Sequence, residues 1–160
     1  MKLIIASAAA LLIIAGAAHA SDFHASLDGF QQVPSVFTEG KGTFEAELDK
    51  NGDTLSYTLT WSNLTAAPTF AHIHFGQART NGGVIAFLCG GGGKPACSDG
   101  TVSSTITSAD VVGPAAQGIQ PGNFDALLDA LRARAAYANV HTPTFPDGEI
   151  RGQIRGKGGE

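Results

Sequence analysis

The sequence predicts an all-β fold, a Greek-key β-sandwich or barrel with one short helix. Three observations predict it. Short segments alternate apolar and polar side chains with the period of a half-buried strand. Turn-forming residues separate these segments along most of the chain. Only one segment, residues 124–134, repeats apolar residues at helical spacing.

The first half of the chain is expected to form five strands. They are residues 23–28, 43–48, 54–61, 71–75 and 84–88. Asn51 and Gly52 lie between the second and third strands and suit a tight hairpin turn, because both residues tolerate a positive φ. Gly82 and Gly83 are expected to turn the chain between the fourth and fifth strands.

The second half is expected to form three more strands and the helix. The strands are residues 101–107, 137–141 and 148–155. The helix over residues 124–134 follows from the spacing of Phe124, Leu127 and Leu131, with Asn123 placed to cap its N-terminus. Several short strands with a single helix favour one β domain over a layered α/β fold.

The first twenty residues have the pattern of a cleavable secretory signal peptide. Lys2 precedes an apolar run over residues 3–17, and Ala18-His19-Ala20 forms a small-x-small cleavage site. The run is shorter than the roughly 20 apolar residues that a membrane span needs. We therefore predict a signal peptide at residues 1–20 and a single domain at residues 21–160. The protein is expected to be periplasmic or secreted, with no membrane span after cleavage.

The net charge limits the classes of binding partner, and the two cysteines indicate a disulfide bond. The chain has a formal net charge of −4, and phosphate binding needs clustered Lys and Arg, so nucleic acid is not an expected partner. Cys89 and Cys97 are the only cysteines and flank four glycines at residues 90–93. In an oxidising compartment this pair is expected to form a disulfide bond.

Four histidines remain after cleavage: His24, His72, His74 and His141. On a strand, residues i and i+2 point the same way about 7 Å apart, so His72 and His74 share one face. The apolar residues between them occupy the opposite, core-facing side. The same alternation in residues 137–141 places His141 on one face with Asn139.

Three imidazoles suit zinc, copper or nickel, and the affinity order of divalent metals favours copper. The sequence thus indicates a site formed by His72, His74 and His141, with His24 as a possible fourth ligand. The alternative is that these are structural or surface histidines. Polar residues also alternate in residues 149–155, which indicates a half-buried last strand with cross-strand ion pairs. Alternatively, Arg151 lies near the histidines and attracts small anions.

Four motifs in order resemble the CHRD domain, a module named for chordin and found in many exported bacterial proteins. They are Leu27-Asp28-Gly29 with Gln32-Val33-Pro34, Ala71-His72-Ile73-His74-Phe75-Gly76, Tyr137-Ala138-Asn139-Val140-His141-Thr142, and Gly148-Glu149-Ile150-Arg151-Gly152-Gln153. The resemblance spans almost all of residues 21–160. It implies an extracellular β-rich domain and no established reaction.

The histidine pattern is also distantly similar to the copper side of Cu,Zn superoxide dismutases, which are Greek-key sandwiches. That similarity implies a superoxide-dismutase-like fold, copper ligands at His72, His74 and His141, and an anion-guiding role for Arg151. No residue matches the bridging histidine or the zinc-loop ligands of that family.

The leading hypothesis is therefore an exported CHRD-domain protein that binds a transition metal, with copper favoured over zinc. Asn139 or a backbone carbonyl is expected to hold at least one of the rings by its other nitrogen. Two alternatives stay open: a metal-free extracellular module that recognises a protein, and a dismutase-like enzyme. No catalytic residue is assigned, because the chain has no GxSxG, P-loop or HExxH motif, and this favours a binding protein over an enzyme.

Overall fold

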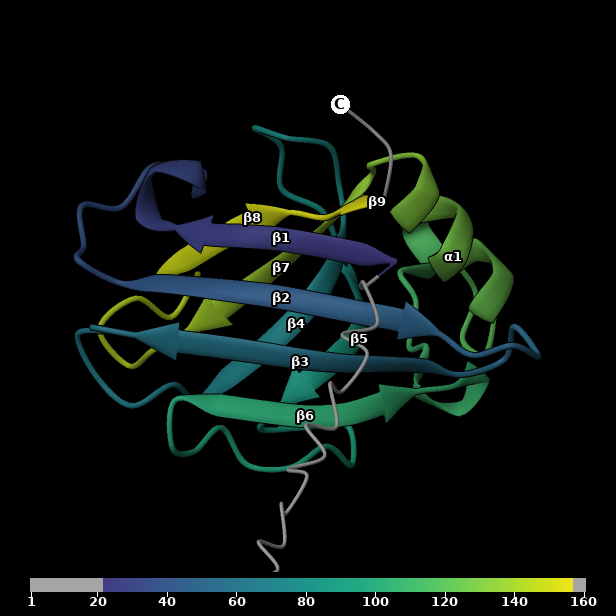
Figure 1. The fold of residues 1–160 in the computed structure, drawn as a ribbon. Coiled ribbons are helices and arrows are strands. Elements are labelled where there is room, and N and C mark those ends of the chain that lie inside the picture. Colours follow the sequence, from purple (N-terminus) through teal and green to yellow (C-terminus); the bar gives the residue numbers. More distant parts are fainter. Residues whose placement is uncertain (1–21, 157–160) are drawn as a thin grey trace, which may run out of the picture.

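The computed structural model describes residues 22–156, whose strands form one antiparallel sheet that curls into a nearly closed barrel (Figure 1). The expected signal peptide at residues 1–20 lies outside the described residues. Within residues 22–156, no helix has the length and apolar character needed to cross a membrane. The predicted all-β fold with one helix is confirmed.

The structure has nine strands, three short 3₁₀ helices and one α-helix in the described part of the chain. The strands are β1 (Phe23–Asp28), β2 (Lys41–Leu48), β3 (Leu55–Ser62), β4 (Phe70–Phe75), β5 (Val84–Cys89), β6 (Thr101–Ile106), β7 (Ala136–His141), β8 (Ile150–Gln153) and β9 (Arg155–Gly156). The helices are η1 (Gly29–Gln31), η2 (Ser108–Asp110), η3 (Ala115–Gln117) and α1 (Phe124–Arg132). Each expected strand is present, and the last one is divided into β8 and β9.

The strands follow the order β5-β4-β7-β8-β1-β2-β3-β6, with β9 paired to β1. Figure 1 shows two layers, with β1, β2, β3 and β6 in front and β4, β5 and β7 crossing behind them. The end strands β5 and β6 contact each other, so the sheet almost closes. Strands β4, β5 and β6 lie next to one another in sequence order, and the following strand, β7, pairs with β4 on its other side. This is the Greek-key order.

The hairpin between β2 and β3 is formed where the sequence predicts it. The carboxylate of Asp49 accepts hydrogen bonds from the backbone N–H groups of Gly52, Asp53 and Thr54. Gly52 adopts a φ of 79°, a left-handed conformation that costs glycine little. The turn thus sets the register in which Leu59 lies opposite Phe44.

The core fills the space between the two layers. Alternate residues of every long strand point into it, as in β3, where Leu55, Tyr57 and Leu59 are buried. Helix α1 covers one end of the barrel (Figure 1), and its own residues Leu127 and Leu131 are fully buried against the core. The sequence pattern therefore reports the core correctly on both strands and helix.

The helix is two residues shorter than expected. Asn123 caps it by accepting a hydrogen bond from the N–H of Ala126 at 3.0 Å, as predicted. The helix ends at Arg132, and Arg134 has a φ of 56°, outside the right-handed helical region. Continuation of the helix to residue 134 was wrong, because the chain turns there to enter β7.

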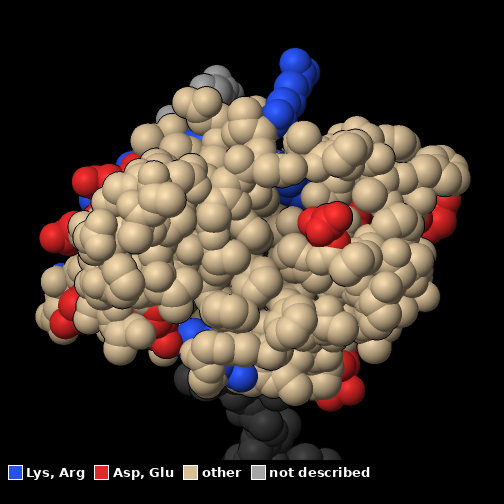
Figure 2. Space-filling view, turned by 180° about the vertical axis from the view of Figure 1, so that it is seen from behind, with Lys and Arg blue, Asp and Glu red and all other residues tan. Residues whose placement is uncertain are grey.

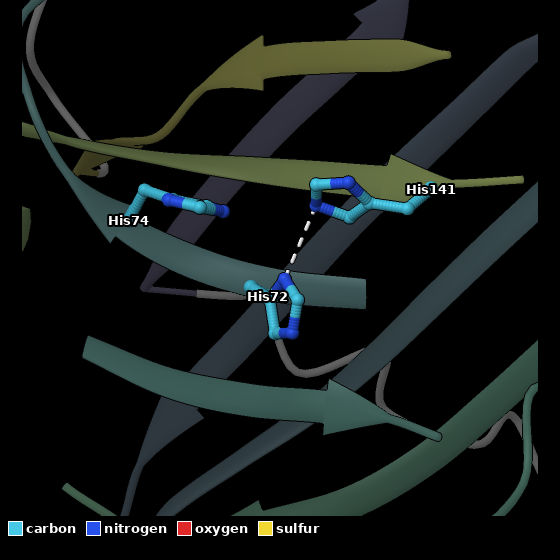
Figure 3. A group of neighbouring side chains, drawn as sticks. All are labelled: His72, His74 and His141. Carbon is cyan, nitrogen blue, oxygen red and sulfur yellow. Dashed lines mark hydrogen bonds between the residues drawn. The ribbon is translucent and has the colours of Figure 1, made fainter. Parts of the chain in front are cut away.

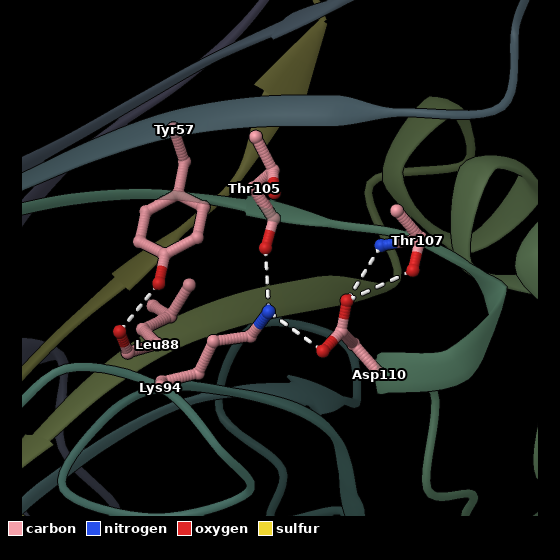
Figure 4. Close-up of polar contacts among 6 residues, drawn as sticks. All are labelled: Tyr57, Leu88, Lys94, Thr105, Thr107 and Asp110. Carbon is pink, nitrogen blue, oxygen red and sulfur yellow. Dashed lines mark hydrogen bonds and ion pairs between the residues drawn. The ribbon is translucent and has the colours of Figure 1, made fainter.

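The disulfide loop covers the seam between β5 and β6. Cys89 and Cys97 are bonded, with an S–S distance of 1.99 Å. Within this loop, the ammonium group of Lys94 donates to the carbonyl of Thr105 and forms an ion pair with Asp110 at 2.7 Å (Figure 4). The hydroxyl of Tyr57, on β3, donates to the carbonyl of Leu88 on β5. The contacts of Lys94 link the β5 and β6 sides, which share no strand ladder, and Tyr57 links the inner strand β3 to β5.

Candidate metal-binding site

The site is built on the outer face of β4 and β7. These strands pair in a register that places Phe70 opposite His141, His72 opposite Asn139, and His74 opposite Tyr137. Side chains of directly opposite residues share a face, so the register brings all three predicted ligands to one side. Figure 3 shows the three rings turned toward one another from the two strands.

The ring nitrogens converge. One nitrogen from each of His72, His74 and His141 lies within 4.8 Å of the other two. The closest pair is Nδ1 of His72 and Nε2 of His141, which are 3.1 Å apart and share a hydrogen bond. Three histidines that the sequence separates by up to 69 residues thus form one compact group that could hold a metal ion.

Two of the rings are oriented by backbone carbonyls. Nδ1 of His74 donates to the carbonyl of Gly82 at 2.9 Å, and Nδ1 of His141 donates to the carbonyl of Pro146 at 2.9 Å. A carbonyl only accepts, so both rings carry their proton on Nδ1 and keep an Nε2 lone pair. Nε2 of His74 is buried and has no hydrogen-bond partner. Metal-ligating histidines commonly have this arrangement, with the second nitrogen anchored behind the ligand.

Gly82 is the residue that makes the first of these contacts possible. A Cβ atom at position 82 would lie 1.6 Å from the carbonyl oxygen of Phe75, a distance that no side chain can tolerate. The backbone therefore passes close enough for its carbonyl to reach His74, while its N–H donates to the hydroxyl of Tyr137. The Gly82-Gly83 pair was predicted as a turn only, and its role in the site was missed.

Aromatic side chains enclose His72. The ring of Phe70 stacks on it with centroids 6.0 Å apart, and Phe87 from β5 meets it edge-on at 4.5 Å. His72 and His141 are each only 9% exposed and His74 is partly buried, so the site is largely shielded from solvent. Figure 2 shows this side of the molecule, where most of the surface is uncharged apart from an Asp or Glu group near the middle and Lys or Arg atoms close to it.

Burial lowers the proton affinity of all three histidines. The pKa of His72 falls to about 3, first because of burial and then because His141 and His74 are close. The pKa of His74 falls to about 4, again mainly through burial, with the carbonyl of Gly82 opposing the shift. The pKa of His141 is also lowered by burial. The rings are therefore neutral at physiological pH, the form that binds metals.

Of the other predicted site residues, Asn139 lies on the histidine face and His24 does not. The carboxamide oxygen of Asn139 accepts a 2.6 Å hydrogen bond from Gln32. His24 is an exposed residue of β1 and lies outside the histidine group. The rings are thus anchored by backbone carbonyls, one of the two expected kinds of anchor, and the sequence did not show that these belong to Gly82 and Pro146.

Arg151 lies next to the site, on β8. Its guanidinium carbon is 3.4 Å from the ring centroid of Tyr137, and that ring stacks on His74 with an interplanar angle of 4°. The predicted cross-strand ion pairs of the last strand are wrong. Arg151 is 1% exposed and Glu149 is fully buried, and neither takes part in the ion pairs found among residues 22–156.

The fold and the site together define a small antiparallel β-barrel domain with a cluster of three neutral histidines on one outer face. The model of the CHRD domain family matches residues 23–154, which include every strand ladder that forms the site. The chain therefore belongs to the CHRD domain family. No curated protein and no solved structure matches it.

Proposed function

We propose that this protein is an exported CHRD-domain protein that binds one transition-metal ion through His72, His74 and His141, with copper preferred over zinc. The observation that carries the proposal is the convergence of three imidazole nitrogens on two paired strands. Imidazole is a ligand for both metals, and divalent copper binds a given nitrogen site more tightly than zinc.

The donor atoms follow from the hydrogen bonds. Nε2 of His74 and Nε2 of His141 carry the lone pairs that would ligate, because Nδ1 of each ring donates to a carbonyl; Nε2 of His141 would have to give up its hydrogen bond from His72. His72 offers Nδ1, the atom that contacts His141. Bonds of roughly 2.0–2.1 Å place ligand nitrogens at most about 4.2 Å apart, so a pair separated by up to 4.8 Å would have to draw closer when a metal binds.

Binding also requires one proton to move. In the metal-free protein, Nδ1 of His72 donates to Nε2 of His141, because the proton of His141 is already on its Nδ1. His72 must carry its proton on Nε2 when Nδ1 binds a metal. Both forms of the ring are neutral, so this exchange requires no net loss of a proton at neutral pH.

Two features support export. The family is an extracellular-type module, and the cysteines within it are bonded, as is usual for proteins that fold in an oxidising compartment. The signal-peptide pattern at residues 1–20 agrees with both. We infer that the protein meets its metal in the periplasm or outside the cell.

Copper titration of tag-free protein tests the proposal. The parent should bind one equivalent of Cu²⁺ at neutral pH, more tightly than Zn²⁺. We expect His74→Ala and His141→Ala to weaken binding by at least about a hundredfold, since loss of a supporting contact alone typically costs 10–100-fold. The matched control is His24→Ala, which removes an exposed histidine outside the group.

The His24→Ala control also distinguishes the proposed site from a competing copper chelate at the N-terminus. An N-terminus beginning at Asp22 would offer its amine and His24, in the third position, to Cu²⁺. The proposal is overturned if the triple variant of His72, His74 and His141 to Ala binds copper as tightly as the parent, or if His24→Ala alone removes the tight site.

A further inference from the structure

A second concave site lies beside the histidines, on the β8 side. It is a cleft of 490 Å³ between the loop after β1 and the loop after β4. Arg79 and Arg151 line it, together with the apolar residues Phe30, Val33 and Pro34, and none of its lining residues is acidic. Figure 2 shows a hollow on this side of the molecule with Lys or Arg atoms inside it and an Asp or Glu group at its rim. A basic cleft is unexpected in a chain whose net charge is −4.

Arg151 is a buried cation whose partners are all neutral. It is 1% exposed, donates to the carbonyl of Gln77 at 3.0 Å and to Oδ1 of Asn81 at 3.4 Å, and lies over the ring of Tyr137. Burial lowers the pKa of its guanidinium. A buried charge is costly unless an opposite charge compensates it, so the cleft favours an anion.

Two acids placed close to Arg151 by the sequence or the sheet register are engaged elsewhere. Glu149 accepts hydrogen bonds from three threonine side chains and one backbone N–H. Asp28 lies opposite Arg151 across the β1–β8 ladder, but its carboxylate accepts from the N–H and side chain of Gln31. The ion pairs among residues 22–156 join other residues. Arg151 therefore has no ion-pair partner among residues 22–156, which leaves its charge to be compensated by an anion from outside the chain.

The walls of the cleft indicate the kind of anion. A guanidinium matches the planar geometry of a carboxylate, while Phe30 is 66% exposed and offers an aromatic surface. The side chain of Asn81 donates to the carbonyl of Val33 at 3.0 Å and ties the two walls together. We propose that this cleft binds a small organic carboxylate with an apolar or aromatic body, held by Arg151 and Arg79.

Benzoate is the probe that tests this proposal, titrated into metal-free protein and followed by backbone NMR shifts. We expect saturable shifts confined to residues 29–36, 76–82 and 151–153. Benzamide, a neutral analogue of similar shape, should cause none, and acetate should bind more weakly because it lacks the ring. The absence of metal keeps this experiment independent of the proposed histidine site.

Variants identify the residues that bind the probe. Arg79→Glu should weaken benzoate binding by about tenfold or more, since a charge-assisted hydrogen bond contributes about 1.5–3 kcal/mol. Arg132→Glu on α1 makes the same charge change outside the cleft and should have no effect. Phe30→Ala should weaken benzoate but not acetate.

Arg151→Gln should abolish benzoate binding in protein whose circular dichroism shows it folded. If that variant does not fold, Arg79→Glu decides the question, because Arg79 is exposed. Equal binding of benzamide and benzoate, or unchanged affinity in Arg79→Glu, would overturn the proposal.

Discussion

At the scale of single residues, the histidine cluster resists protonation. An unfolded histidine has a pKa near 6.5, whereas folding lowers the pKa of His72 to about 3 and of His74 to about 4. Below about pH 6.5 the unfolded chain therefore binds more protons than the folded chain. Stability must fall with pH in that range.

We predict that the metal-free protein loses stability as the pH drops from about 6.5 toward about 4. The contribution of the histidines is complete above the unfolded pKa and is lost as the pH approaches the folded values, at up to about 1.4 kcal/mol per pH unit for each ring. Urea unfolding at about pH 7, 6 and 5 measures it.

A histidine variant tests whether the pH dependence of the free energy of unfolding comes from the histidine cluster. His72→Gln should make the dependence on pH shallower, while His24→Ala, at an exposed position, should leave it unchanged. Glu149 and Asp110 also have lowered pKa values, but carboxylates contribute below about pH 4.5. A free energy of unfolding that is constant between about pH 5 and 7 would contradict the prediction.

At the scale of elements, the barrel closes through side chains and a covalent bond where β5 and β6 meet. The Cys89–Cys97 bond and the ion pair of Lys94 with Asp110 hold the loop after β5 against the β6 side (Figure 4). Lys94 and Asp110 are partly buried, which makes this contact stronger than an exposed surface pair. The seam is thus protected without a continuous strand ladder.

We predict that Cys89→Ser combined with Cys97→Ser lowers the free energy of unfolding by about 2–3 kcal/mol, because the short loop loses its cross-link in the unfolded state. Copper affinity should change by less than about threefold, since the loop supplies no ligand to the proposed site. Urea unfolding and copper titration measure the two effects. Loss of copper binding in a folded double variant would show that the loop supports the histidines.

At the scale of the whole molecule, the single barrel is expected to begin near the end of a removable leader. Signal peptidase requires small residues at the first and third positions before the cut, which Ala20 and Ala18 supply. Strand β1 starts at Phe23, so cleavage after Ala20 leaves the barrel intact.

We predict a mature N-terminus at Ser21, which intact-mass spectrometry of exported protein measures directly. Ala20→Gln should block processing and retain the precursor, because the residue before the cut must be small. His19→Gln changes the tolerant middle position and serves as the control. Exported protein that keeps Met1 would contradict this.

Local pattern was enough to predict the elements. Alternation defines the two faces of a strand without knowledge of its neighbours, so the core residues of β3 and the shared face of His72 and His74 were correct. The hairpin at Gly52 and the cap at Asn123 were also predicted, since each depends on residues close in sequence.

The alternation of polar and apolar residues could not predict which parts of the chain contact the polar face of each strand. Alternation marked Arg151 as polar and suggested ion pairs, but the loops after β1 and β4 cover that face and leave the guanidinium buried among neutral partners. For the same reason, the sequence could not show that the carbonyl of Gly82 orients His74. Every residue has a backbone carbonyl, and only the folded loop determines which one points at the ring.

The sequence by itself determined the strands, their core faces, the disulfide and the three histidines as candidate ligands. Only the tertiary structure decided that β4 pairs with β7, which brings His141 to the other two and leaves His24 outside. The physical reason is that faces follow from the local period of the chain, whereas strand partners depend on packing between residues far apart in sequence.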